Sequence, residues 1–370
     1  MPDYDVVIIG AGIAGASLAA EIAPHCRVLI AEAEDRPGYH STGRSAAFWA
    51  ESYGGPQVQP LTTASGPWLA SPPPGYGDRS FLGPRGALTL ARGDELHLLG
   101  EFQTSFAGTG VRMEPRDRAA LVAQVPGLAA DIVAGIFEPD CCDIDVGALH
   151  QAYLATARRA GAGLALRSPL LAAQHGSAGW VLTLGDQQVT ARTLVNAAGA
   201  WADPVAIRAG VRPLGVQPYR RTVLQMRTNP AAPVDLPLTL GVRGDYYFKP
   251  EAGRLWLSPH DETPEPAADS APDELDMALA IDRFQQVVDW RIEAVEHRWA
   301  GQRSFAPDRL PLIGFASDGP DFFWFAGQGG FGIQTAPAAA KLAASILLGL
   351  TPDPMLGRVD AKLYDPARLG

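Results

Sequence analysis

The chain has 370 residues, and its 30 Lys and Arg stand against 40 Asp and Glu, a formal net charge of -10. This length allows two domains with sizeable cores, and an acidic surface repels nucleic acid and anionic lipid on average, so we expect no nucleic-acid partner. The 3 cysteines, which include the vicinal pair Cys141–Cys142, indicate neither a disulfide framework nor a zinc site, so we expect no metal and a reducing compartment.

No segment indicates export or membrane insertion. The first predicted strand begins by Val6, which leaves no room for a signal peptide, and the apolar stretch Leu342–Leu350 is too short to span a bilayer. We therefore expect a cytoplasmic protein without a transmembrane segment, and peripheral contact with the inner membrane stays open.

The first predicted element is a short buried strand, Val6–Ile9, which an alanine-rich helical pattern follows. Between them, Gly10, Gly12 and Gly15 spell G-x-G-x-x-G. In such a motif the first glycine allows the tight turn at the end of the strand, the second lets a pyrophosphate approach the backbone, and the third lets the helix pack against the sheet. The N-terminus of the helix offers free N–H groups and the positive end of its dipole to the phosphates.

A second apolar run, Arg27–Ala31, ends at Glu32, 22 positions after Gly10. An acid at this place accepts the ribose hydroxyls of an adenosine dinucleotide and argues against a 2′-phosphate, which favours FAD or NAD over NADP. An ordinary βαβ unit with a glycine-rich turn is the alternative, and the combination of strand, helix and acid speaks against it.

After Glu32, Pro37 and Gly38 mark a turn, and the small polar residues of Ser41–Ser45 lead into the apolar Ala46–Trp49. We expect a helix that begins here behind a serine or threonine cap. Such an end suits the second half of a bound cofactor, and a loop and cap without a ligand fits this stretch equally well.

Together with the glycine motif and Glu32, the run Gly38–Ala47 resembles the D-amino-acid oxidase superfamily of FAD enzymes, and within it the bacterial D-arginine dehydrogenases most closely. The similarity covers nearly the whole chain, at Asp143–Asp145, Leu194–Trp201, Arg212–Gly215, Trp299–Gly301 and Gln328–Thr335. It implies an α/β fold with a Rossmann-like FAD-binding domain and a second, mostly antiparallel β-sheet domain for the substrate. We expect the discontinuous FAD-binding domain at residues 1–75, 136–205 and 301–370, and the substrate-binding domain at residues 76–135 and 206–300.

The remaining patterns fit these two domains. Residues 66–92, rich in proline and glycine, predict a loop region, in which the resemblance implies a mobile active-site lid, and residues 136–145 are expected to return to the first domain. Asp261–Asp273 is predicted to be an exposed connector. Helices are predicted at Arg118–Val125, Val146–Ala160, Glu274–Val288 and Ile333–Leu348, and strands at Leu164–Leu166, Trp180–Leu184, Leu194–Asn196, Arg221–Met226, Asp245–Lys249, Arg254–Ser258 and Phe322–Ala326.

Two further turns are expected at the cofactor. Small residues at Ala197–Trp201 close a strand and let the backbone pass close to a ligand. Four glycines within Gly327–Gly332 exceed what a structural turn needs, and the helix after them would aim its N-terminus at the flavin. We expect non-covalent FAD, because no cysteine lies near this C-terminal segment and all three cysteines lie in the first half of the chain. His40 is the one candidate for a covalent link, which we do not expect. The implied FAD contacts are Gly10, Gly12, Ile13, Ala14, Gly15, Glu32, Ser41, Thr42, Arg44, Ser45, Ala46, Ala198, Gly199, Trp201, Gly329, Gly330, Gly332, Ile333, Gln334 and Thr335.

An α-amino acid needs its carboxylate anchored beside flavin N5, and the planar fork of arginine suits a carboxylate. The resemblance implies Arg221 and Arg303 as the anchors, although most arginines are solvated or salt-bridged. Arg220 and Arg221 are adjacent in a predicted strand, so only one of them faces the site. The further site residues that the resemblance implies, two ring hydroxyls and a carbonyl for the substrate amine, are Tyr53, Tyr247 and Gly330.

Three positions depart from the D-arginine dehydrogenase pattern. Phe48 and Ala50 stand where it has a histidine and a threonine, and Ala87 replaces the glutamate that pairs with the cationic side chain. Desolvating a guanidinium without its carboxylate costs several kcal/mol, so we expect arginine and lysine to be poor substrates.

We therefore predict FAD-dependent oxidation of a D-amino acid with an apolar or aromatic side chain, by hydride transfer to flavin N5. The imino acid formed hydrolyses to a 2-oxo acid and ammonia. Two alternatives stay open: oxidation of a cyclic or N-substituted amino acid or a 2-hydroxy acid, and a flavin-binding protein without turnover. The electron acceptor, oxygen, a quinone or a dye, also stays open.

Overall fold

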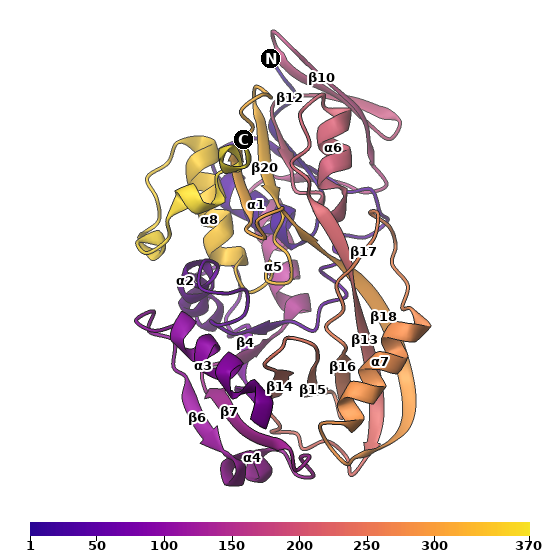
Figure 1. The fold of residues 1–370 in the computed structure, drawn as a ribbon. Helices are drawn as coiled ribbons and strands as arrows, with labels where there is room; N and C mark the ends of the chain where they lie inside the picture. Colours follow the sequence, from indigo (N-terminus) through magenta and orange to yellow (C-terminus); the bar gives the residue numbers. More distant parts are fainter.

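Two large β-sheets and a small one organise the chain, and the computed structural model describes all of residues 1–370. Figure 1 shows the first large sheet with its helices above the second. The 8 strands of the first sheet are, in order, β10 (Leu170–Gly176), β11 (Gly179–Leu184), β12 (Gln187–Asn196), β1 (Tyr4–Ile9), β2 (Val28–Ala31) and β9 (Gly163–Ala165), with β20 (Phe322–Ala326) beside β12 and β19 (Leu312–Phe315) beside β20. The pairs around β1, β2 and β20–β12 are parallel, which confirms the Rossmann-like arrangement.

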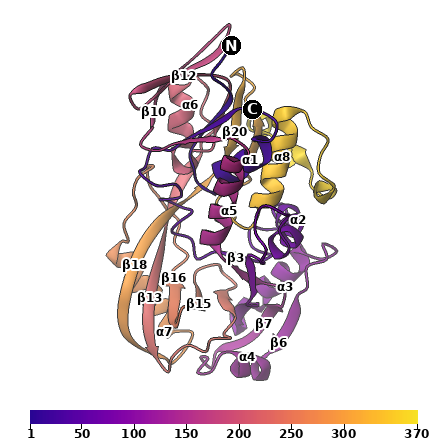
Figure 2. The same cartoon turned by 180° about the vertical axis from the view of Figure 1, so that it is seen from behind.

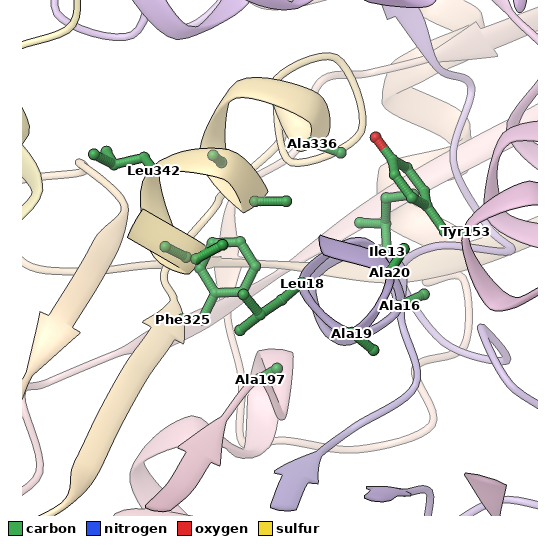
Figure 3. Packing of buried hydrophobic residues seen from close by; sticks show 14 of the residues in the cluster. Ile13, Ala16, Leu18, Ala19, Ala20, Tyr153, Ala197, Phe325, Ala336 and Leu342 are labelled. Atoms are coloured by element: carbon green, nitrogen blue, oxygen red, sulfur yellow. The ribbon is translucent and has the colours of Figure 1, made fainter. Parts of the chain in front are cut away.

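Helices cover both faces of this sheet. On one side α1 (Ile13–Ile22) packs between α5 (Val146–Arg159) and α8 (Ala336–Leu348), and on the other side lies α6 (Ala202–Arg208). Ala16, Ala19 and Ala20 of α1 are buried together with Leu18, so this helix is apolar nearly all round, as a helix enclosed by protein must be. Figure 3 shows Leu18 beside the ring of Phe325, where α1, β20 and α8 meet.

The second sheet has 9 strands and forms the other half of the molecule (Figure 2). Its order is β17 (Thr263–Pro264), β13 (Gln217–Asn229), β16 (Arg254–Ser258), β15 (Tyr247–Glu251), β14 (Leu238–Gly241), β5 (Ala87–Arg92), β7 (Ile132–Glu138) and β6 (Glu114–Asp117), with β18 (Arg291–Phe305) along β13. Every pair except β14–β5 is antiparallel, so the mostly antiparallel second sheet is confirmed. The helices of this half are α3 (Leu96–Ser105), α4 (Arg118–Gln124) and α7 (Glu274–Gln285).

Two features connect the halves. The long strands β13 and β18 pair from Gln217–Phe305 to Asn229–Arg291, and Phe305 also forms a bridge to Gln328 beside the first sheet. A small sheet of β3 (Phe48–Trp49), β8 (Cys142–Ile144) and β4 (Leu82–Pro84) lies near α2 (Gln59–Ala70). We propose that the two large sheets define the two domains expected from the sequence. No helix in the structure is long and apolar enough to cross a membrane.

The prediction of a helix beginning at Ala46–Trp49 is wrong. Residues 37–44 form turns, in which the Gly43 N–H donates to the Gly38 carbonyl at 2.8 Å, and Phe48–Trp49 is the strand β3. Both aromatic side chains are buried, and the Trp49 indole donates to the Thr62 carbonyl at 2.8 Å. An extended backbone buries two adjacent side chains on opposite faces, which a helix does not.

Residues 66–92 form a loop only in their middle, so the prediction of a loop region is wrong at both ends. The helix α2 continues to Ala70 with Pro67 inside it, and β4 and β5 occupy most of the stretch from Leu82 on. Gly66 serves close packing rather than a turn, because a Cβ there would lie 2.6 Å from Cζ2 of Trp49.

Several boundaries also differ from the prediction. Ile136–Glu138 belongs to β7 of the second sheet, so the chain returns to the first half only after Glu138. Turns at residues 329–335 delay α8 until Ala336, and α7 ends at Gln285. The connector Asp261–Asp273 is mostly exposed but contains the strand β17, because its residues 263 and 264 pair with β13.

Candidate active site

A cavity of about 370 Å³ lies at the carboxyl ends of the parallel strands β1, β2 and β12. Ligands of open α/β sheets bind at this edge. The predicted cofactor residues that line the cavity are Gly10, Gly12, Ile13, Ala14, Glu32, Ser41, Thr42, Ser45, Ala198, Gly199, Trp201, Gly329, Gly330, Gly332 and Ile333.

The glycine turn leaves bare backbone on the cavity. Gly10 has a φ of 104°, and a Cβ on it would lie 2.5 Å from the carbonyl oxygen of Ala197, so only glycine fits here. Gly15 lies against the Gly10 carbonyl, outside the cavity, and lets α1 pack against the turn. At Gly12 a Cβ would meet only the Thr42 hydroxyl, at 3.2 Å, so this glycine keeps open the space that a pyrophosphate needs.

The carboxylate of Glu32 is held in a fixed position at the cavity wall. Its Oε2 accepts the Ala11 N–H at 2.8 Å and its Oε1 accepts the Glu34 N–H at 3.0 Å. The side chain is buried apart from the edge that lines the cavity. A carboxylate restrained in this way is suited to ribose hydroxyls, which need a preformed acceptor.

Five of the predicted cofactor residues do not line this cavity, and their contact with the cofactor stays a prediction: Gly15, Arg44, Ala46, Gln334 and Thr335. Arg44 donates to the carbonyls of Ala300, at 3.0 Å, and Ser270, at 3.1 Å, and pairs with Asp269. Arg44 therefore links the turns of residues 37–44 to β18 and to the connector Asp261–Asp273. Gln334 donates to the Tyr53 carbonyl at 2.9 Å and lines a neighbouring pocket with Ala46.

The sequence interpretation missed another wall of the cavity, Ser168–Leu171, together with Arg208, whereas His40, which it considered for a covalent link, also lines the cavity. Ser168–Leu171 follows β9, which is parallel to β2, so the rule that pointed to Glu32 applies to β9 as well. The His40 ring lies 4.5 Å from the Trp201 ring, between centroids, and its Nε2 is 2.9 Å from Glu34. No sequence pattern predicts these contacts of His40 with Trp201 and Glu34.

A second, smaller pocket adjoins the cavity, and the two share Ser45, Arg303, Gly330 and Ile333. The smaller pocket is also lined by Phe48, Tyr53 and Tyr247, from three separate elements. The structure thus brings most of the predicted substrate residues to one place beside the cofactor cavity, although they lie far apart in the sequence.

Arg303 is the most unusual group of this pocket. It is only 7% exposed, and no carboxylate of the chain pairs with it; its Nη1 donates to the Gln302 carbonyl at 3.3 Å. Burial and the neighbouring guanidinium of Arg221 lower the pKa of Arg303. A buried guanidinium without a partner is unfavourable, so the pocket is electrostatically prepared for an anion.

Arg221 and Arg220 point in opposite directions from β13, as their adjacency predicts. Arg221 is buried near Tyr53 and Tyr247, and donates to the Asp261 carbonyl at 2.9 Å and to Glu262 at 3.2 Å. Arg220 pairs with Asp276 at 2.8 Å. Glu262 also pairs with Arg309, at 2.7 Å, so it compensates Arg221 only in part.

Apolar side chains also line the smaller pocket, among them Phe48, whose ring lies 4.9 Å from the Tyr53 ring, between centroids. Ala50 and Ala87 belong to one buried cluster with Phe48 and Tyr247 but, like Arg221, do not line the pocket themselves. No charged side chain lines the smaller pocket except Arg303. The three departures from the D-arginine dehydrogenase pattern therefore lie together.

Glu138, which the sequence interpretation missed, lies directly opposite Ala87 in the β5–β7 register. Its carboxylate accepts the N–H of Glu51 at 2.7 Å and the hydroxyl of Ser52 at 2.5 Å, and burial raises its pKa. It holds the turn that carries Tyr53 and does not line the pocket. An alternating strand sequence does not reveal such a distant partner.

The sequence model of the family described as FAD dependent oxidoreductase matches residues 5–346. This chain belongs to that family. FAD is therefore the cofactor of this FAD-dependent oxidoreductase, and the bare glycine turn, the restrained Glu32 and the N-terminus of α1 fit its adenosine and pyrophosphate.

Among known proteins, this FAD-dependent oxidoreductase is 26% identical to glycine oxidase of Geobacillus kaustophilus, over 93% of either chain. It is 25% identical to the bifunctional protein ThiO/ThiG of Synechocystis sp., over 95% of this chain but only 53% of the relative, so it spans about half the length of that protein. The crystal structure of L-proline dehydrogenase from P. horikoshii superposes with a TM-score of 0.85 at 21% identity, covering 100% of this chain and 98% of the other.

Proposed function

We propose that this protein oxidises a D-amino acid with an apolar or aromatic side chain to the imino acid, which hydrolyses to a 2-oxo acid and ammonia. When bound, FAD supplies the hydride acceptor at N5. The observation that carries the proposal is the buried guanidinium of Arg303, which has no acidic partner and lines both the cofactor cavity and the smaller pocket.

The residues of the chain bind and orient the substrate in this proposal. Arg303 and Arg221 hold the carboxylate, and the Gly330 carbonyl, where the two cavities meet, accepts a hydrogen bond from the amine. Phe48 contacts the substrate side chain, and Ala87 lies behind it in the same apolar cluster. Holding the substrate at both polar ends brings its Cα to one position, which is the main contribution of a protein to hydride transfer.

Two further observations support an amino acid of this kind. The relative from Geobacillus kaustophilus is named glycine oxidase, and glycine carries the same amine and carboxylate. The cluster around Phe48 and Ala87 offers apolar contact and no acid. Burial of an apolar side chain there contributes about 25 cal/mol per Å², whereas a cationic side chain would lose its hydration without compensation. The D configuration rests on the resemblance described above.

The test is anaerobic mixing of the oxidised holoenzyme with D- and L-amino acids, N-methylated and cyclic amino acids, and 2-hydroxy acids, followed by the flavin absorbance. Bleaching by D-leucine, D-methionine or D-phenylalanine supports the proposal. Bleaching by 2-hydroxy acids or N-substituted amino acids alone replaces it with the alternative oxidation, and no bleaching by any compound indicates a flavin-binding protein without turnover.

A further inference from the structure

His260 is a half-buried residue of the loop between β16 and β17, and its ring lies beside Tyr53 and Tyr247, two residues that line the smaller pocket. The ring centroid lies 5.6 Å from that of Tyr247 and 6.2 Å from that of Tyr53. Its Nε2 is 3.5 Å from the Tyr53 hydroxyl, and its Nδ1 is 2.5 Å from the Gly244 carbonyl oxygen.

These contacts decide where the proton of the imidazole lies. A carbonyl oxygen only accepts hydrogen bonds, so Nδ1 must donate to Gly244 and the neutral ring has its lone pair on Nε2, toward Tyr53. Burial, Arg221, Arg303 and Arg309 lower the pKa of His260 to about 3, which keeps the ring neutral. The carboxylate of the adjacent residue, Asp261, accepts hydrogen bonds from the Thr222 N–H at 2.7 Å and from the Thr222 hydroxyl at 2.9 Å.

The backbone of His260 has a φ of 53°, in the left-handed region that side chains other than glycine seldom adopt. Its N–H donates to the Ser258 hydroxyl at 3.0 Å, which holds this conformation. Backbone strain of this kind is concentrated at functional sites.

Tyr53 links His260 to the place of the substrate amine. A Cβ on Gly330 would lie 2.7 Å from the Tyr53 hydroxyl, so this hydroxyl lies next to Gly330, between it and His260. Gly244, at the other end, is exposed, and His260 is half-buried, so the imidazole is within reach of solvent.

We propose that Tyr53 and His260 form a proton relay that deprotonates the substrate ammonium before hydride transfer. The inference rests on the proposed function. An N–H bond of the ammonium breaks and its proton passes to the Tyr53 oxygen, while the Tyr53 O–H proton passes to Nε2 of His260. The amine keeps the electron pair, which forms the C=N bond as the hydride leaves Cα, and the imidazolium later releases its proton to solvent. The bound carboxylate offsets the charge of Arg221 and Arg303, so the imidazole gains proton affinity once the substrate is in place.

The test uses the oxidised holoenzyme and the variants His260→Asn and Tyr53→Phe. Asparagine tolerates positive φ and its amide still donates to Gly244, but it lacks Nε2. With D-leucine under anaerobic conditions, the flavin reduction rate of both variants should fall at least about tenfold at pH 7 and then rise about tenfold per pH unit toward the pKa of the free amine, because only neutral amine reacts. The wild-type rate should vary far less with pH. His97→Gln, at an exposed position of α3, is the matched control and should behave as wild type.

Binding of isovalerate, which has a carboxylate and a branched apolar chain one methylene shorter than that of leucine but no amine, separates the relay from a structural role. Its dissociation constant, measured by perturbation of the flavin spectrum, should change less than about twofold in His260→Asn. Two results overturn the relay and leave the proposed function intact. One is a wild-type pH profile in both variants. The other is a loss of isovalerate affinity in His260→Asn as large as its loss of flavin reduction rate. A wild-type holoenzyme that no amino acid reduces overturns both proposals.

Discussion

Replacing Arg303 with methionine should affect substrate binding and stability in opposite directions. The guanidinium is only 7% exposed and has no acidic partner, so the bound carboxylate is the first anion to compensate it. Removing one member of a desolvated, hydrogen-bonded charge pair costs about 2–5 kcal/mol. This corresponds to roughly a 30-fold to several-thousand-fold increase in the dissociation constant of a carboxylate ligand.

The same change should leave the ligand-free holoenzyme as stable as wild type or more stable. Arg221 and burial already lower the pKa of Arg303, which means that the folded protein holds this charge at a cost. Methionine fills similar space and carries no charge, so the cost disappears. The assay is isovalerate titration by flavin absorbance, with thermal unfolding of the same samples and flavin content from the visible spectrum.

Arg220→Met is the matched control, because Arg220 is adjacent to Arg221 on β13 but pairs with Asp276 at 2.8 Å, away from the pocket. It should lower the stability and leave isovalerate binding unchanged. The reasoning about Arg303 is refuted if Arg303→Met binds isovalerate as wild type does, or if it is destabilised as much as Arg220→Met.

Three further predictions concern specificity, the cofactor and pH. The kcat/KM for D-leucine should exceed that for D-arginine by at least roughly tenfold, which requires a difference of only about 1.4 kcal/mol. The variant Ala87→Glu should shift this preference toward D-arginine. If D-arginine is the best substrate of the wild type, the argument from the apolar pocket is contradicted. Acid precipitation should leave the yellow colour in the supernatant, whereas a coloured pellet would mean a covalent flavin. Burial raises the pKa of Glu138 above the ordinary 4.5, so the folded state binds the proton more tightly and stability falls as pH rises from 4.5 through the raised pKa. In urea unfolding, Glu138→Gln should flatten the dependence of the free energy of unfolding on pH in this range. An unchanged dependence would mean that another group causes it.

The parts of the site that the sequence predicts are those that one segment determines by itself. Gly10, Gly12 and Glu32 follow from a strand, a turn and the next strand, and the structure lines the cavity with all three. The opposite directions of Arg220 and Arg221 follow from the alternation of side chains in a strand. In each case, no distant part of the chain had to be known.

The parts that the sequence does not predict depend on distant partners. Phe48–Trp49 has the apolar character of a helix start, but β8 pairs with it and turns it into a strand. Gly66 resembles a loop residue until the ring of Trp49 is known to lie against it. His260 has no motif around it, and only the meeting of β13, β15 and the Tyr53 turn gives it neighbours.

Glu138 shows why the position of an acid matters as much as its presence for specificity. Directly opposed residues of an antiparallel pair share a face, so Glu138 and Ala87 start from the same side of the sheet. The carboxylate of Glu138, however, accepts the N–H of Glu51 and the hydroxyl of Ser52, and it does not line the pocket. Pairing it with a substrate guanidinium would break those hydrogen bonds and release the turn that carries Tyr53. A buried acid that is one strand away therefore stabilises the pocket without making it a site for cations.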